Sequence, residues 1–301
     1  MNAATQPGLR GQLRSNEPMA PHVSWRAGGA VANAFFPADL ADLAGFLGGL
    51  RSDEPLLMVG LGSNLLVRDG GFAGTAVFTH GALGSLRRED DGRIYAEAGV
   101  PSPKLARFAA NHDLAGAEFF AGIPGTVGGA LAMNAGCHGG ETWQCVDRAL
   151  MLTRRGALVE RQPEEFSIGY RHVGLKRATD EIFAGAWLRL TSGDGAAARA
   201  RIAELLDKRM ASQPLDLPNA GSVFRNPPGD HAARLIEAAG LKGAEIDGAR
   251  VSEKHSNFIV NPGGKASAAA IERLIGRVQA EVRQRFGVEL MREVRIVGEA
   301  A

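Results

Sequence analysis

The chain has 301 residues, of which 45% are hydrophobic and 22% charged, and its formal net charge is +1. This composition excludes wholesale disorder and a fibrous protein, and the balanced charge excludes the global positive field that holds nucleic acid. The length corresponds to about two domains of ordinary size. Glycine, with 40 residues, is about twice as frequent as usual, so the position of its clusters is informative.

The N-terminal segment, residues 1–24, is polar and predicts a loose arm without a signal-peptide core. No window is long and apolar enough to span a membrane, so we expect a cytoplasmic protein. Cys137 and Cys145 are too few for a disulfide framework and lack CxxC spacing, so both are expected to be ordinary thiols. The scattered histidines show no metal-ligand spacing, and no metal site is predicted.

Apolar runs between turn residues predict strands, and apolar residues at helical spacing predict helices, in the mixed order of an α+β protein. The first two thirds of the chain contain predicted strands at 55–59, 75–79, 93–98, 148–153 and 182–190, and predicted helices at 38–50 and 103–112. Small polar residues at 191–195 indicate a domain boundary. Beyond it we predict helices at 196–210, 230–239 and 268–286 and strands at 257–260 and around 288–297.

The first glycine-rich loop follows the predicted strand 55–59 and reads Gly60-Leu-Gly62-Ser63-Asn64. It begins like a dinucleotide-binding fingerprint. The third glycine of that fingerprint is replaced by Leu65, however, and a strand-like run follows instead of a helix. The loop is therefore either a tight turn that needs positive φ or part of a ligand site of another kind.

The second glycine-rich loop reads Gly122-Ile123-Pro124-Gly125-Thr126-Val127-Gly128-Gly129 and continues to Asn134-Ala135-Gly136. It has no lysine in the Walker position and is not a P-loop. Glycines let backbone N–H groups of a nest or helix start approach phosphate oxygens, which suits a pyrophosphate. Close packing of a buried glycine and alanine segment is the structural alternative. Two such loops together favour a bulky phosphorylated cofactor.

Arg171 and Ser222 are polar residues in stretches without apolar periodicity. Arg171 ends the stretch 166–172, where its guanidinium can clamp a carboxylate with two hydrogen bonds or lie on the surface. Ser222 lies among small residues in 219–227, where a hydroxyl can face a cavity. The sequence around it does not fit the G-x-S-x-G elbow of hydrolases.

Two further polar residues lie toward the C-terminus. Glu293 is expected to alternate with Val294 and Ile296 along a strand, and it faces either a ligand or solvent. His255 lies in a polar run before the predicted strand 257–260. It either contacts a ligand phosphate or is a hydrogen-bonded structural histidine.

Taken together, six motifs in chain order resemble the UDP-N-acetylenolpyruvoylglucosamine reductase family of flavoenzymes. They are Gly60-x-Gly62-Ser63-Asn64-Leu65-Leu66-Val67, residues 122–129, Asn134-Ala-Gly136, Tyr170-Arg171, Ala220-Gly221-Ser222-Val-Phe-x-Asn226-Pro227 and Glu293-Val-Arg-Ile-Val-Gly298. The resemblance implies an α+β fold with a FAD-binding domain of the vanillyl-alcohol-oxidase (PCMH) type in two lobes, at 25–192. A smaller C-terminal α+β substrate domain is expected at 196–301, with its last strand, about 288–298, returning to the active site. Because 182–190 continues as one strand without an inserted tyrosine-bearing loop, the chain resembles the shorter subtype.

The resemblance also implies the ligands and the residues that bind them. The cofactor is expected to be non-covalent FAD, with NADPH as hydride donor and UDP-N-acetylglucosamine enolpyruvate as substrate. The residues expected at FAD are Gly60, Gly62, Ser63, Asn64, Gly122, Ile123, Pro124, Gly125, Thr126, Val127, Gly128, Gly129, Asn134, Ala135 and Gly136. Arg225, Asn226 and His255 are expected at the substrate, Asn226 as a contact of the uridine diphosphate. No nucleic acid and no membrane-spanning segment are expected.

The chemistry of the family implies roles for Arg171, Glu293, Ser222 and Arg225. Hydride transfer from the flavin N5 to the enolpyruvyl group leaves an enolate, whose negative charge needs preorganised stabilising groups. Arg171 and Glu293 are expected to stabilise it, with Glu293 protonated because a charged carboxylate repels an enolate. Ser222 is expected to donate the proton that completes UDP-N-acetylmuramate, with Arg225 restraining the alkoxide that remains.

Two other functions compete with this interpretation. The first is an oxidoreductase on the same flavin fold that uses oxygen as acceptor, which would lack the combination of Ser222 and Glu293. The second is a nucleotide-sugar binding protein with vestigial catalytic residues. Intact Arg171, Ser222 and Glu293 argue against the second alternative.

Overall fold

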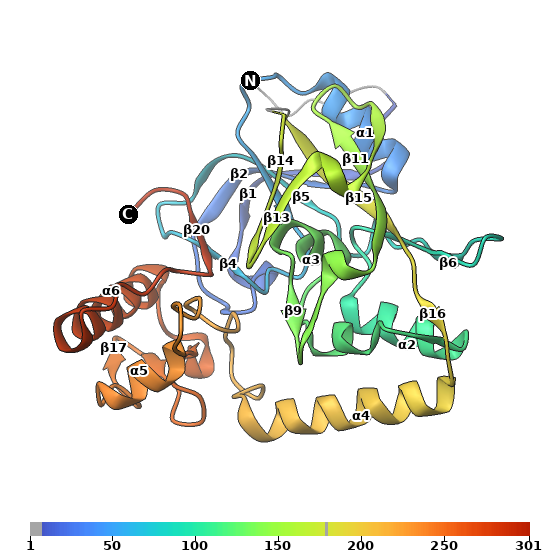
Figure 1. Ribbon diagram of the computed structural model, residues 1–301. Coiled ribbons are helices and arrows are strands. Elements are labelled where there is room, and N and C mark those ends of the chain that lie inside the picture. The colour runs from blue at the N-terminus through green and yellow to red at the C-terminus, as the bar shows by residue number, and fades with distance from the viewer. Residues whose placement is uncertain (1–7, 178–179) are drawn as a thin grey trace. The chain divides into compact units, whose positions relative to one another are not determined.

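The computed structural model describes residues 8–177 and 180–301 (Figure 1). The chain divides into two compact units. Unit 1 takes in Asn33–Leu61, Gly74–Lys208 and the described part of Met1–Ser15; unit 2 takes in Asn16–Ala32, Gly62–Ala73 and Arg209–Ala301. Unit 2 therefore includes two segments from the N-terminal part of the chain, whereas the sequence suggested a single boundary near residue 193.

The helices and strands occur in mixed order along the chain. The α-helices are α1 (Leu40–Gly49), α2 (Ser102–Asn111), α3 (Val127–Met133), α4 (Gly195–Ser212), α5 (Ala232–Ala238) and α6 (Ala268–Phe286). The 3-10 helices are η1 (Ala20–His22), η2 (Glu118–Gly122), η3 (Thr142–Gln144), η4 (Pro163–Glu165) and η5 (Pro262–Gly264). The strands are β1 (Gln12–Pro18), β2 (Ala30–Phe36), β3 (Leu56–Val59), β4 (Leu65–Val67), β5 (Phe72–Phe78), β6 (Leu86–Arg88), β7 (Ile94–Glu97), β8 (Leu114–Ala115), β9 (Gly136–Cys137), β10 (Gly140–Glu141), β11 (Val146–Thr153), β12 (Leu158–Arg161), β13 (Phe166–Gly169), β14 (His172–Leu175), β15 (Glu181–Leu188), β16 (Thr191–Ser192), β17 (Glu245–Ile246), β18 (Ala249–Val251), β19 (Ile259–Val260) and β20 (Arg295–Val297).

The predicted helices, and the strands predicted up to residue 260, are confirmed with ends shifted by a few residues. The strand predicted around 288–297 is confirmed only for Arg295–Val297, since the chain before it is irregular. The loose arm predicted at 1–24 is wrong within the described residues, because β1 and η1 lie there and residues 1–7 fall outside the description. β1 is the edge strand of the four-stranded sheet β1-β2-β5-β3. Its sequence, QLRSNEP, is largely exposed and has no apolar face, so period-2 hydrophobicity gives no signal for it.

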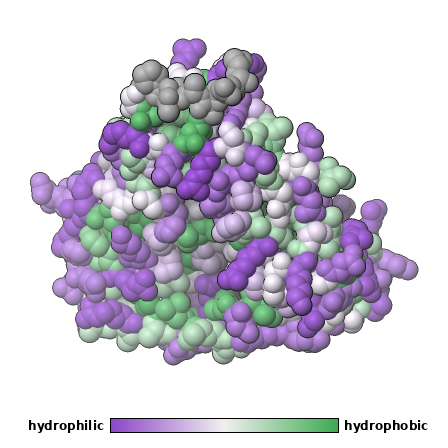
Figure 2. Space-filling model, turned by 180° about the vertical axis from the view of Figure 1, so that it is seen from behind, coloured by the Kyte–Doolittle hydropathy of each residue, from purple (hydrophilic) through white to green (hydrophobic). Residues whose placement is uncertain are grey.

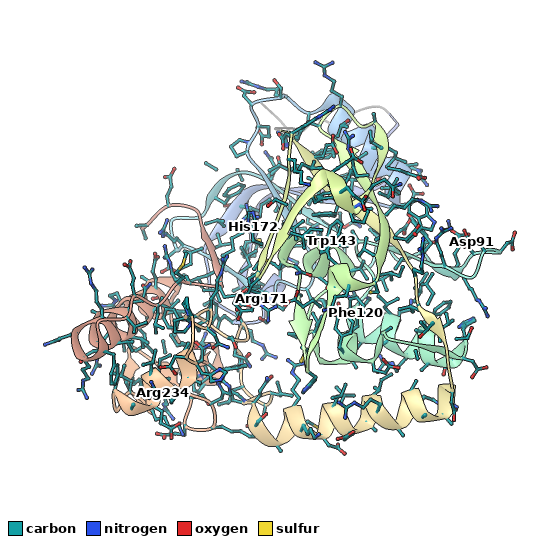
Figure 3. The ribbon with its side chains drawn as sticks, viewed as in Figure 1. Asp91, Phe120, Trp143, Arg171, His172 and Arg234 are labelled. Atoms are coloured by element: carbon teal, nitrogen blue, oxygen red, sulfur yellow. The ribbon has the colours of Figure 1, made fainter. Side chains whose placement is uncertain are left out.

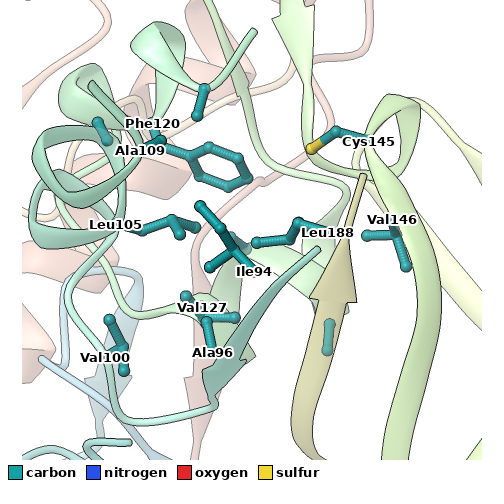
Figure 4. Packing of buried hydrophobic residues seen from close by; sticks show 14 of the residues in the cluster. Ile94, Ala96, Val100, Leu105, Ala109, Phe120, Val127, Cys145, Val146 and Leu188 are labelled. Carbon is teal, nitrogen blue, oxygen red and sulfur yellow. The ribbon is translucent and has the colours of Figure 1, made fainter. Parts of the chain in front are cut away.

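A five-stranded antiparallel sheet with the order β12-β11-β15-β7-β6 forms the centre of unit 1. Alternate side chains of its strands enter two different cores: Ile94 and Ala96 join one cluster, and Tyr95 joins the other. Burial on both faces explains why β11 reads as an almost continuous apolar run. Figure 4 shows the first cluster, with Ile94 among Leu105, Val127 and Leu188.

Unit 2 has a core of its own, built mainly by α5, α6 and the sheet β17-β18-β19. Helix α6 begins where the Ser267 hydroxyl accepts a hydrogen bond from Ala270 N–H, and it ends at Gly287 in the left-handed conformation (φ 69°). Trp25 is fully buried in this core, and its indole N–H donates to the carbonyl of Ile259 over 2.7 Å. This contact explains why Asn16–Ala32 belongs to unit 2.

The apolar side chains that do not enter these clusters are distributed among polar ones. On the face shown in Figure 2, hydrophilic residues predominate and hydrophobic residues lie between them in small groups. Within the part of the chain that the structure describes, no helix is both long and apolar enough to cross a membrane.

Candidate active site

The first glycine-rich loop connects β3 to β4, and both of its glycines are required by the backbone. Gly62 has a φ of 60°, and a Cβ there would lie 2.1 Å from the carbonyl oxygen of His22. A Cβ on Gly60 would lie 2.4 Å from Oγ1 of Thr126, so in unit 1 the two glycine-rich loops touch. The expectation of a tight turn with positive φ is thus confirmed at Gly62.

The second glycine-rich loop contains glycines with two different roles. A Cβ on Gly122 would meet Sγ of Cys137 at 2.6 Å, and one on Gly128 would meet Cβ of Ala98 at 2.8 Å, so both positions serve close packing. Gly129 is exposed, and a Cβ there would have only Oγ1 of Thr126 within reach, at 4.0 Å, among the described atoms. Space over Gly129 is therefore open for another molecule.

Some of the backbone N–H groups of this loop donate hydrogen bonds to carbonyls of the same chain. Ile123, Val127 and Gly128 donate to the carbonyls of Phe120, Val100 and Ala98 at 2.8–3.1 Å. Pro124 has no N–H group. A phosphate at this loop would therefore face other N–H groups, of which Gly125, Thr126 and Gly129 are the candidates.

Helix α3 grows out of this loop and ends at Asn134, which adopts the left-handed conformation with φ 41°. The Asn134 side chain is buried; its amide donates to Glu141 Oε2 at 2.9 Å and to the Gly169 carbonyl at 3.3 Å, and its oxygen accepts from Trp143 N–H at 3.1 Å. Asn134 thus binds the chain that follows the helix, at Glu141 and Trp143. It also joins the loop to the β13–β14 hairpin.

Arg171 lies in the turn of that hairpin with φ 54°, and Figure 3 labels it there next to His172. Its Nη1 donates to the carbonyl of Asn134 over 3.4 Å and its Nη2 to that of Gly136 over 3.1 Å. Its guanidinium also lies 5.0 Å from the centre of the Tyr170 ring. Within unit 1 the structure therefore brings Arg171 together with the predicted cofactor residues Asn134, Ala135 and Gly136.

Ser222 lies in unit 2, directly after Gly221, which has a φ of 73°. Asn219 Oδ1 accepts a hydrogen bond from Gly221 N–H at 2.9 Å and thereby closes a short turn. Ser222 is half-buried, and the next two residues, Val223 and Phe224, are buried. The turn thus presents the hydroxyl at the border of the core.

Glu293 lies in an irregular segment two residues before β20, not within a strand as the alternation with Val294 and Ile296 predicted. The reason is that its N–H group donates to the Val223 carbonyl, at 2.8 Å, in an irregular pairing that ends where β20 begins. The side-chain amide of Asn64 donates to the Glu293 carbonyl over 3.2 Å. Within unit 2 the structure therefore brings together Asn64, Glu293 and the segment that follows Ser222.

Arg225 and Asn226 continue the chain after Ser222. Arg225 N–H donates to the Met291 carbonyl at 2.9 Å, and its Nε is buried without a hydrogen-bond partner among the described residues. Asn226 is exposed, and its Oδ1 accepts from Ala232 N–H at 3.1 Å at the start of α5. The Arg225 Nε is therefore buried, whereas the Asn226 side chain is exposed.

His255 is half-buried and meets the Phe258 ring edge-on, with ring centroids 4.7 Å apart. Burial lowers the pKa of His255 below its usual value of 6.5. Its Nδ1 is buried and has no hydrogen-bond partner in the described chain, so a proton there would find no acceptor. Burial therefore favours the neutral form of this histidine.

Sequence reasoning did not single out Asn257, which binds the backbone close to Ser222. It was assigned only to the start of a strand, yet its buried carboxamide bonds both the N–H and the carbonyl of Phe224. The signal available was a polar residue opening an otherwise apolar run. The described residues contain no group of three His, Cys, Asp or Glu side chains that is arranged to hold a metal ion.

Two family models match the chain. Residues 31–161 match the FAD binding domain, and residues 213–297 match the UDP-N-acetylenolpyruvoylglucosamine reductase C-terminal domain. The matches confirm the expected architecture of a vanillyl-alcohol-oxidase type FAD-binding domain with a C-terminal domain, and FAD as cofactor. The continuous strand β15 likewise agrees with the shorter subtype.

Relatives match over nearly the whole length. The UDP-N-acetylenolpyruvoylglucosamine reductase of Thiobacillus denitrificans is 59% identical over 98% of this chain and 95% of its own, and that of Nitrosomonas eutropha is 54% identical over 97% and 90%. The crystal structure of UDP-N-acetylenolpyruvylglucosamine reductase from Thermus caldophilus is 30% identical, with a TM-score of 0.80 over 96% of this chain and 99% of that one. The chain is an FAD-dependent oxidoreductase and belongs to the UDP-N-acetylenolpyruvoylglucosamine reductase family.

Proposed function

We propose that this protein reduces UDP-N-acetylglucosamine enolpyruvate to UDP-N-acetylmuramate at the expense of NADPH. The observation that carries the proposal is the hydrogen bond from Glu293 N–H to the Val223 carbonyl. Through it the backbone at Glu293 adjoins the backbone of the residue that follows Ser222. The names of the relatives support the substrate. We also propose that 25–192 bind FAD and 196–301 the substrate.

The glycine-rich loops fit FAD. The open space over Gly129 and the N–H groups of Gly125, Thr126 and Gly129 suit a pyrophosphate that lies directly on the backbone. We assign Gly60, Gly62, Ser63 and Asn64 of the first loop, residues 122–129, and Asn134, Ala135 and Gly136 to this cofactor. Bound at these residues, FAD would supply the redox chemistry, the passage of a hydride from NADPH to the enolpyruvyl group.

Arg171 stabilises the negative charge that develops on the substrate. Its guanidinium is held against two carbonyls, so the positive charge is oriented before the reaction begins. Groups preorganised in this way stabilise a transition state without the cost of reorganising during the reaction.

Glu293 and Ser222 share the remaining chemistry. A protonated Glu293 donates a hydrogen bond to the carboxylate end of the enolate, where a charged side chain would repel it. The Ser222 hydroxyl gives its proton to the carbon next to that carboxylate, and Arg225 restrains the resulting alkoxide by its charge. Within unit 2 the backbone at Glu293 is hydrogen-bonded to Val223, the residue after Ser222. This bond favours a constant spacing between the Glu293 carboxyl group and the Ser222 hydroxyl.

The nucleotide part of the substrate is assigned to Arg225, Asn226 and His255. The buried Nε of Arg225 without a partner suits an anionic ligand such as a diphosphate. Because burial favours the neutral form of His255, its role here is that of a hydrogen-bonding group rather than of a cation.

The experiment that tests the proposal follows the absorbance of the purified protein under anaerobic conditions. We expect a flavin spectrum that bleaches with NADPH and returns when the enolpyruvyl sugar is added. Ser222→Ala should bleach normally but recover about 100-fold or more slowly, since general-acid catalysis contributes about 10²–10⁴-fold.

Other outcomes distinguish the competing functions. Protein that stays colourless and cannot be loaded with FAD would contradict the proposal and favour a nucleotide-sugar binding protein. Rapid recovery with oxygen but none with the sugar would favour an oxidase. Normal recovery of Ser222→Ala would refute the role of that serine.

A further inference from the structure

Asn257 is a polar residue in the core of unit 2, with an exposed fraction of 4%. Its Oδ1 accepts a hydrogen bond from Phe224 N–H at 3.0 Å, and its Nδ2 donates to the Phe224 carbonyl at 2.8 Å. Its own carbonyl accepts from Val223 N–H at 2.9 Å. Three hydrogen bonds from one residue therefore fix the two residues that follow Ser222.

The carboxamide acts here as a peptide group would in a neighbouring strand. On its other side the same segment pairs with the chain around Glu293: the Val223 carbonyl accepts from Glu293 N–H, and Arg225 N–H donates to the Met291 carbonyl. The segment from Val223 to Arg225 is thus held from two sides. Ser222 is joined directly to it and has only the short turn at Gly221 before it.

Loss of the Asn257 carboxamide would leave two buried polar groups of Phe224 without partners. Such groups are costly, and a backbone relieves the cost by moving toward water or other partners. Movement of Phe224 shifts Ser222 relative to the Glu293 segment. Displacement of a reacting group by about 1 Å can cost about 100-fold in rate.

Asn261 provides a contrast four residues further along the chain. It is fully buried, its Nδ2 donates to the Trp25 carbonyl at 2.8 Å, and its Oδ1 accepts from Ala266 N–H at 2.8 Å. It makes hydrogen bonds of the same kind, but to residues that do not adjoin Ser222 or Glu293.

We propose that Asn257 is a positioning residue for Ser222, holding the serine hydroxyl in register with Glu293 for proton donation. The proposal rests on the role proposed for Ser222. It concerns the step in which the substrate is protonated and not the step in which NADPH is consumed.

The test uses the holoenzyme of Asn257→Asp and Asn257→Ser, with Asn261→Asp and Asn261→Ser as matched controls and Ser222→Ala as reference. Anaerobic stopped-flow absorbance measures flavin reduction by NADPH and, separately, its reoxidation by the enolpyruvyl sugar. For the Asn257 variants we expect reduction within about twofold of wild type and reoxidation at least about tenfold slower, with a larger solvent deuterium isotope effect. In Asn257→Ser, amide hydrogen exchange should also be faster at Phe224, because its N–H group loses its partner. In Asn257→Asp the carboxylate can still accept from that N–H group, and it is the Phe224 carbonyl that loses its donor.

The controls separate positioning from stability. The Asn261 variants should unfold at lower temperature while keeping the wild-type ratio of the two rates. If the Asn257 variants lose both rates together, or fail to retain FAD, Asn257 is only structural and the proposal is overturned. If Ser222→Ala is slow and the Asn257 variants are normal, this proposal alone fails. If Ser222→Ala reoxidises normally, the role proposed for the serine fails first.

Discussion

The end of helix α3 orients the guanidinium group of Arg171. Because α3 stops at a left-handed Asn134, the chain turns and the carbonyls of Asn134 and Gly136 become acceptors for the guanidinium. The planar fork of arginine reaches both at once, whereas the ammonium of lysine is a single point charge. The orientation of the charge, and not only its sign, is set by the protein.

We therefore expect Arg171→Lys to slow reoxidation of the flavin by the enolpyruvyl sugar by about 10²–10³-fold, the usual effect of removing one preorganised group. The rate of flavin reduction by NADPH and the melting temperature should change little. Stopped-flow absorbance measures both rates. Arg201→Lys, on the surface of α4 in an ion pair with Glu204, is the matched control and should behave like wild type. Equal rates for Arg171→Lys and wild type would exclude charge orientation as the function of Arg171.

At the same scale, the sequence indicates some residues of the candidate site and not others. Arg171, Ser222 and Glu293 stand in motifs that can be read locally. Asn257 could not be found in this way, because its partner Phe224 lies 33 residues earlier and its burial depends on the tertiary fold. The irregular segment at Glu293 was likewise not predicted, since it results from pairing with Val223 and not from local propensity.

Helix α6 is joined to the strand pair β4–β20 by one ion pair. Arg68, directly after β4, donates from Nε and Nη2 to the two carboxylate oxygens of Glu272 at 2.8 Å, and from Nη1 to the Gly298 carbonyl at 3.0 Å. Asp69 accepts from the N–H groups of Ala268 and Ala269 at the start of the helix. Strand β4, which follows the first glycine-rich loop, pairs with β20, which follows Glu293. The contacts of Arg68 and Asp69 with α6 therefore hold both strands.

Removal of the charge in Glu272→Gln should lower the free energy of unfolding by up to about 1 kcal/mol at pH 7, since this pair is bidentate but solvent screens it in part. The hydrogen bonds from Arg68 lower the pKa of Glu272 below its usual value of 4.5. The stabilisation is therefore complete above pH 4.5 and is lost as the pH falls through the pKa of the folded state. Urea unfolding at several pH values should show the difference between wild type and variant shrinking in acid.

Glu281→Gln is the control for this element, because Glu281 pairs with Arg285 on the exposed side of the same helix at 3.7 Å. It should change stability by less than about 0.5 kcal/mol at any pH. A Glu272→Gln effect that is the same at pH 4 and pH 7 would show that the ion pair is not its cause.

The elements differ in how far the sequence predicts them. Helix α6 combines a regular apolar stripe, an N-cap serine and a C-terminal glycine, and its predicted limits, 268–286, are those observed. The hairpin β13–β14 carries Arg171 but was not predicted, because seven of its eight strand residues are only partly buried or exposed, in an irregular pattern, and its partners are set by the fold. The periodicity of apolar residues is thus weaker in the hairpin that carries Arg171 than in helix α6.

At the scale of the whole molecule, FAD couples binding to stability. A ligand that binds only the folded protein stabilises it by about 2.7 kcal/mol at 100 times its dissociation constant. FAD held without a covalent bond should leave the protein on heat denaturation and appear in the supernatant. Apoprotein should then melt several degrees lower than the holoprotein, and added FAD should restore the difference.

Gly129 and Gly276 separate the binding of FAD from the stability of the chain. Both are exposed helical glycines, and the atoms described around them leave room for a methyl group. Alanine should be tolerated by the apoprotein at either position, since it favours helix over glycine by up to about 1 kcal/mol. If FAD lies on the backbone of Gly129, Gly129→Ala should weaken FAD binding at least about tenfold and reduce the rise in melting temperature that FAD produces, whereas Gly276→Ala should leave both unchanged. Fluorescence titration of apoprotein with FAD measures the affinity, and equal affinities for the two variants would remove Gly129 from the cofactor site.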